Sequence, residues 1–87
     1  MASVNYTSIE VNATSTVATS QVKTAHIVYL INDGAESITF NIDNLVTGDN
    51  KFTLKAGEKM VDLPIAIDTL YYKTVTNPAA FRFFGLK

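Results

Sequence analysis

Residues 25–31 read AHIVYLI, which predicts a β-strand that is apolar on both faces. Successive side chains of a strand point to opposite sides of its sheet. One face therefore carries Ala25, Ile27, Tyr29 and Ile31. The other face carries His26, Val28 and Leu30. Since a two-layer protein of 87 residues has a single interior, the second face has to meet something else.

A hairpin is predicted to join this strand to residues 37–42, SITFNI, which alternate between polar and apolar side chains. The Asp33-Gly34 pair between them is a turn signal because both residues tolerate positive φ. A turn centred there pairs Tyr29 with Ile38, so the face that carries Tyr29 becomes the core face. A three-residue loop would exchange the two faces, and the turn chemistry favours the first register.

The remaining strands follow at short intervals. A loop is expected at 44–50, a second hairpin at 51–63, a strand region at 65–75 and a final strand at 81–86. In the final strand Phe81 and Phe83 are expected to point inward, with Arg82 pointing outward. Strands of this length between turn signals predict an all-β fold. We expect a small antiparallel β-sandwich or partly open β-barrel of six or seven strands.

The first part of the chain differs in character from the rest. Residues 1–23 are rich in Thr and Ser and show no helical periodicity, so they are expected to form an extended polar arm with one or two short strands. Residues 24–87 are then the β-sandwich domain. The beginning, MASVNYTSIEV, lacks the basic and apolar regions of a signal peptide, which predicts synthesis in a cytoplasm.

Composition excludes several classes of partner. Seven Lys and Arg residues stand against eight Asp and Glu residues, which leaves no electrostatic footprint for nucleic acid or an anionic membrane. No apolar stretch has the length of a membrane span. The chain has no cysteine, so disulfides and thiolate metal sites are excluded, and oligomerisation remains a common way to stabilise so small a fold.

The residues give weak support for catalysis or metal binding. His26 is the only histidine, and it is expected to hydrogen-bond Asn41 rather than to act as a base beside Asp43. The segment NIDNLVTGDN holds the hard oxygen ligands that calcium prefers, Asp43, Asn44, Asp49 and Asn50. Asp and Asn are also ordinary turn residues, which is the favoured interpretation. We predict no catalytic residue, no metal site and no cofactor.

The two-sided apolar pattern predicts an interface, because exposed apolar patches usually mark protein–protein contacts. The expected interface residues are His26, Val28, Leu30, Tyr71, Arg82, Phe84 and Leu86. Either a neighbouring subunit or the chain's own arm would cover this face. An alternative is a carbohydrate- or receptor-binding module that uses the aromatic side chains of Tyr71, Tyr72 and Phe84.

The order of motifs is suggestive as well. After the Asn-Asp-Gly turn come ITFNID, FTLKAGEK, IDTLYYK and a short aromatic strand. Over residues 24–86 this order resembles small all-β virion proteins of tailed bacteriophages, the capsid decoration or cement proteins and related head or tail accessory proteins. The resemblance implies a non-enzymatic structural protein, found in the virion after synthesis in the host cytoplasm. Its partners would be copies of itself, a major capsid protein or another virion protein.

Overall fold

The computed structural model describes residues 5–87, and these residues form eight β-strands with no helix. The strands are β1 (Tyr6–Ala13), β2 (Ala18–Thr24), β3 (His26–Asn32), β4 (Ile38–Ile42), β5 (Phe52–Leu54), β6 (Lys59–Leu63), β7 (Ile67–Thr74) and β8 (Ala79–Leu86). The expected all-β class and antiparallel sandwich are confirmed. The number of strands is eight rather than six or seven.

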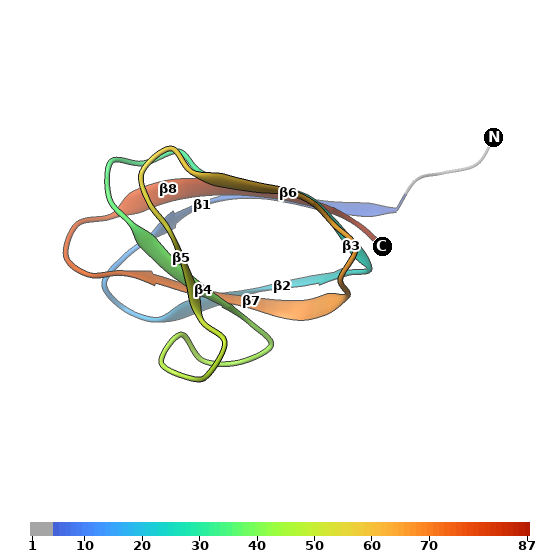
Figure 1. The fold of residues 1–87 in the computed structure, drawn as a ribbon, viewed down its shortest axis with the longest axis horizontal. Helices are drawn as coiled ribbons and strands as arrows, with labels where there is room; N and C mark the ends of the chain where they lie inside the picture. The colour runs from blue at the N-terminus through green and yellow to red at the C-terminus, as the bar shows by residue number, and fades with distance from the viewer. Residues whose placement is uncertain (1–4) are drawn as a thin grey trace.

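Two antiparallel four-stranded sheets face each other (Figure 1). The first sheet has the order β1-β8-β3-β6, and the second has the order β2-β7-β4-β5. Of the strands that follow one another in the sequence, only β4 and β5 pair within a sheet. Every other connection carries the chain from one sheet to the other. Eight strands in this arrangement form a jelly roll.

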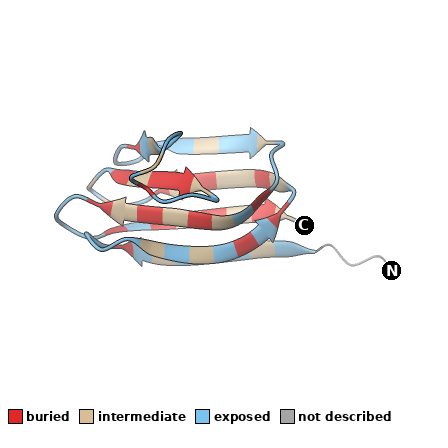
Figure 2. Ribbon diagram, turned by 90° about the horizontal axis from the view of Figure 1, so that it is seen from below, coloured by how far each residue is buried: buried red, intermediate tan, exposed pale blue. Residues whose placement is uncertain are grey.

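Side chains fill the space between the sheets, and buried positions alternate with more exposed ones along most strands (Figure 2). Phe81 of β8 lies at the centre of this core. Its ring meets Phe40 of β4 edge to face at 5.1 Å between centroids, and Tyr72 of β7 at 4.7 Å. The two sheets are therefore joined by aromatic contacts in the favoured geometry.

Neither expected hairpin forms, because β3 and β4 lie in different sheets, as do β5 and β6. The buried Asn32 side chain organises the connection after β3. Its amide donates to the carbonyl oxygens of Glu36 and Leu54 at 2.7 and 2.9 Å, and its oxygen accepts from the Gly34 N–H at 2.9 Å. Gly34 has no positive φ. A Cβ there would lie 2.6 Å from that of Ala79, so close packing, not turn geometry, requires the glycine.

The facing expected for β3 is wrong beyond Ile27. Against β8 the register shifts between Ile27 and Tyr29, which leaves Val28 as the extra residue of a β-bulge. The alternation therefore changes phase, and Leu30 lies in the core at 1% exposure. Tyr29 and Ile31, expected inside, lie half-buried on the outer face. Leu30 is consequently not an interface residue.

Two strands form where residues 1–23 were expected to be an arm with one or two short strands, but they belong to the sandwich rather than to a separate arm. Residues 1–4 of the expected arm lie outside the described residues. The two strands are β1 and β2, which pair with β8 and β7 as edge strands of the two sheets. Ala13 and Val22 belong to the core, and Ile9 and Val11 pack against it. Their alternation is weak in the sequence because polar residues, Thr7, Ser20 and Thr24, also occupy inward positions on these strands.

Candidate interaction surface

The solvent side of the first sheet carries a row of stacked aromatic rings. Tyr6 of β1 stacks on Phe84 of β8 at 5.3 Å between ring centroids, and Tyr29 of β3 stacks on the same Phe84 at 5.7 Å. Strand pairing brings them together, since Phe84 lies opposite Tyr29 in the β8–β3 ladder. We call this surface the aromatic face and define it by Tyr6, Tyr29, Ile31, Val61, Phe84 and Leu86.

The aromatic face is open to solvent at both sides of the sheet. Tyr6 on β1 is 56% exposed and Val61 on β6 is 54% exposed. The side chains that lie between Tyr6 and Val61 are half-buried. These are Phe84, Tyr29, Ile31 and Leu86. An apolar row that crosses all four strands of a sheet on its solvent side is unusual for an isolated domain and is typical of a binding surface.

Two side-chain pairs border the aromatic face. Arg82 donates from Nε and Nη2 to the two carboxylate oxygens of Asp33 at 2.5 and 3.1 Å, and its guanidinium carbon lies 5.9 Å from the ring centroid of Tyr29. The hydrogen bond to Asp33, and then the charge of that carboxylate, raise the pKa of Arg82. The pair thus fixes a cation beside the aromatic rings.

The second side-chain pair, His26 with Asp62, lies at the other end of the sheet. His26 Nε2 is 2.8 Å from Asp62 Oδ1. Asp62 has a positive φ of 56°, which interrupts the alternation of β6 and lets Leu63 pack against the core while Val61 faces outward. His26 therefore pairs with Asp62 rather than with Asn41 or Asp43, the partners considered from the sequence.

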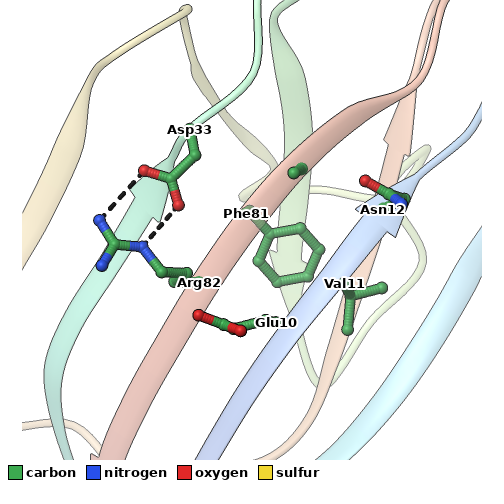
Figure 3. A pocket seen from close by; sticks show the side chains of 7 residues that line it. Glu10, Val11, Asn12, Asp33, Phe81 and Arg82 are labelled. Carbon is green, nitrogen blue, oxygen red and sulfur yellow. Dashed lines mark hydrogen bonds and ion pairs between the residues drawn. The ribbon is translucent and has the colours of Figure 1, made fainter.

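A hollow of about 260 Å³ opens beside the Asp33–Arg82 pair (Figure 3). It is lined by Glu10, Val11, Asn12, Asp33, Ala80, Phe81 and Arg82. Ala80 lies opposite Asn12 in the β1–β8 ladder, and its short side chain leaves room between the longer polar ones. The hollow therefore presents carboxylate and amide groups together with the Arg82 guanidinium, which lies beside the Tyr29 ring.

Asp43, one of the oxygen ligands considered for calcium, has structural partners instead. Asp43 Oδ1 accepts the main-chain N–H groups of Asp68 and Thr69 at 2.9 and 2.7 Å. The Asn41 amide donates to the carbonyl oxygens of Leu45 and Asp49 and so shapes the loop after β4. Within residues 5–87, no group of three or more His, Cys, Asp or Glu side chains is placed to hold a metal ion.

The structure brings part of the expected interface together. His26, Arg82, Phe84 and Leu86 lie on the outer side of the first sheet. Val28 is half-buried at the bulge, and Tyr71 lies on the second sheet. The aromatic set proposed for carbohydrate does not form one surface, because Tyr72 is 4% exposed and its hydroxyl hydrogen-bonds Ser20 Oγ at 2.8 Å.

Sequence reasoning missed four residues of the aromatic face, which are Tyr6, Tyr29, Ile31 and Val61. Tyr6 carried a usable signal, because it lies three residues before Ile9 and so must face the opposite way along a regular strand. Tyr29 and Val61 carried no such signal, since a bulge or a positive φ changes the phase of each strand at the neighbouring residue.

No protein-family model matches this chain, and none of the curated proteins does. Similarity to solved structures is found at the level of fold. A cupin-2 domain-containing protein from Shewanella frigidimarina superposes with a TM-score of 0.58 at 12% identity, over 95% of this chain and 72% of that chain. A de novo designed double-stranded β-helix gives 0.54 at 19% identity, over 95% and 99% of the two chains.

A third similar structure comes from Bacillus endospore appendages, described as disulfide-linked pili. Its TM-score is 0.53 at 14% identity, over 95% of this chain and 86% of that chain. At these identities the similarities show a shared β-sandwich fold and carry nothing about activity. Within residues 5–87, no helix has the length and apolarity to cross a membrane.

Proposed function

We propose that this chain is a non-enzymatic structural protein that binds copies of itself or another subunit of a larger assembly through the aromatic face. The observation that carries the proposal is the row of apolar side chains from Tyr6 to Val61, which crosses the solvent side of the first sheet. Burying such a surface against a partner is favourable by about 25 cal/mol for each Å² of apolar area.

The polar pairs at the border suit the same role. Interfaces combine an apolar centre with a polar rim, and aromatic side chains and arginine are enriched in them. Here Arg82 is held by Asp33 beside Tyr29, so it is oriented before a partner arrives. In an assembly of many copies, each contact can be weak because the lattice adds avidity.

The experiment compares two valines that are both exposed. Val61→Lys places a charge in the aromatic face, and Val75→Lys places the same charge in the connection between β7 and β8, where Val75 is 81% exposed. Both variants should fold, because neither side chain is in the core. Electron microscopy and light scattering of the concentrated protein should show ordered assembly for the wild type and for Val75→Lys, and none for Val61→Lys. Equal assembly by both variants would contradict the proposal.

The setting that we propose is a phage virion, and this rests on the sequence resemblance alone. If the protein is a decoration or accessory protein, an antibody raised against it should detect it on sedimented particles from cells that carry the gene. Detection only in the unassembled fraction would remove the virion from the proposal and leave the interaction surface unaffected.

The hollow beside Arg82 favours a second candidate function, the binding of carbohydrate. Sugars are bound by polar side chains that hydrogen-bond hydroxyl groups together with an exposed aromatic ring. Glu10, Asn12 and Asp33 provide such polar groups around the hollow, and the Tyr29 ring lies beside Arg82 at its border. Binding on a glycan array that is lost in Glu10→Ala and unchanged in Val75→Lys would support this candidate, and an empty array would exclude it for the glycans tested.

A further inference from the structure

The four edge strands of the sandwich differ in how they are protected from pairing with another chain. β5 has three residues, and β6 has five with a positive φ at Asp62 and Pro64 just after it. β2 has a positive φ at Lys23 and a register shift between Gln21 and Thr24. Short length, proline and bulges are the usual devices that prevent edge pairing.

β1 has none of these devices. It runs for eight residues in unbroken register with β8, has no positive φ and contains no proline, lysine or arginine. Within the described residues it pairs on one side only, at the lower border of the sandwich in Figure 2. Its one charged side chain is that of Glu10, and a long, regular edge with so little charge is a template for another strand.

The hydrogen-bonding direction of β1 follows from one bond at its end. The Lys87 N–H donates to the Asn5 carbonyl at 2.9 Å, and these residues are directly opposite in the β1–β8 register. Because bonded and non-bonded pairs alternate in an antiparallel ladder, the odd residues of β1 bond to β8. The main-chain groups of the even residues therefore point to the open edge. These residues are Tyr6, Ser8, Glu10 and Asn12, and all four are exposed.

We propose that β1 pairs antiparallel with β1 of a second copy of this chain, which joins two first sheets into one continuous sheet. A two-fold axis at Ile9 lets all four edge residues exchange both of their main-chain hydrogen bonds with the partner strand. Ser8 then lies opposite the second copy's Glu10, and Tyr6 lies opposite its Asn12. Shifting the axis to Glu10 would put two carboxylates opposite each other, which is unfavourable.

The inner side of β1 favours a second copy over an unrelated strand. Ile9 and Val11 are only half-buried at this edge although they pack against the core. In the proposed register Ile9 lies opposite Ile9 of the second copy, and Val11 lies opposite the second copy's Thr7. The apolar side chains of the two sandwiches therefore cover each other. The contact is isologous and uses one surface twice. It involves the edge of the sheet and, apart from Tyr6, none of the residues that define the aromatic face.

The main-chain test uses two substitutions at one position. Ser8→Pro removes an N–H that points to the open edge and leaves the bonds between β1 and β8 in place, and Ser8→Ala keeps that N–H. In analytical ultracentrifugation of the full chain, the wild type and Ser8→Ala should show a concentration-dependent dimer, and Ser8→Pro should stay monomeric with a cooperative melting transition. A wild type that is monomeric throughout, or a folded Ser8→Pro that dimerises like Ser8→Ala, would overturn the inference.

Charged substitutions at Ser8 test the register of the proposed β1–β1 pairing. They leave the main chain unchanged, so they also test the proposal if Ser8→Pro does not fold. Ser8→Lys should tighten the dimer and Ser8→Glu should weaken it, each by roughly two- to twentyfold, because Ser8 meets the second copy's Glu10 twice per dimer. Ser8→Glu combined with Glu10→Lys should restore the affinity. Equal affinities for the lysine and glutamate variants would rule out this register. A dimer lost in Val61→Lys and kept in Ser8→Pro would assign the contact to the aromatic face and overturn the inference.

Discussion

Phe40 and Phe83 show how much of the stability rests on single side chains. Both are fully buried, one in each sheet. Replacing either with alanine removes a large apolar side chain and leaves a cavity, at an expected cost of about 3–5 kcal/mol in the free energy of unfolding. Since small domains have a margin of similar size, both variants should be largely unfolded in thermal melts followed by circular dichroism. A near-native melting temperature would show that the site can collapse around the smaller residue.

Two buried threonines offer substitutions that should increase the stability of the fold. Thr24 and Thr74 are 4% and 1% exposed, and neither hydroxyl has a hydrogen-bond partner among the described residues. Valine has nearly the same shape, so Thr74→Val should raise the free energy of unfolding by about 1 kcal/mol, measured in denaturant. Thr39→Val is the control, because the Thr39 hydroxyl lies 3.4 Å from that of Thr53 and is not buried. A loss of stability in Thr74→Val would mean that the hydroxyl has a partner.

At the scale of the element, the connection between β3 and β4 depends on one amide side chain. Asn32 bonds three main-chain groups, two of them in the connection itself and one on β5 of the other sheet. Asn32→Ala leaves those groups without partners in a buried place, which should cost about 2–4 kcal/mol in the free energy of unfolding. Asn12→Ala, on the exposed side of β1, should change it by less than about 0.5 kcal/mol. Similar losses of stability in the two variants would contradict this role of Asn32.

At the scale of the whole molecule, the topology makes nearly every strand pair non-local. Only β4 and β5 are neighbours in both the sequence and a sheet, and β1 pairs with the last strand. Closing such long loops before contacts can form is slow, so refolding should take on the order of milliseconds to seconds, as for other β-sandwiches. Stopped-flow fluorescence of the tyrosines would measure the rate. Completion within microseconds would contradict the expected dependence on topology.

The sequence by itself determined the all-β class and the facing of two strands. Alternation placed Ile38 and Phe40 inside, and it placed Phe81 and Phe83 inside with Arg82, Phe84 and Leu86 outside, as the structure has them. A period of two is a local property of the chain, so it can be read wherever a strand runs without interruption. This was enough to anticipate an apolar outer face on β8.

Only the tertiary structure decided which strands pair and where the alternation breaks. The local turn signals favoured hairpins, but β3 pairs with β6 and β8, which are distant in the sequence. A bulge at Val28 in the pairing of β3 with β8 moves Leu30 into the core and Tyr29 onto the aromatic face. Pairing and bulges depend on contacts between distant segments, because the free energy of a strand comes mostly from the neighbours it meets in the folded sheet.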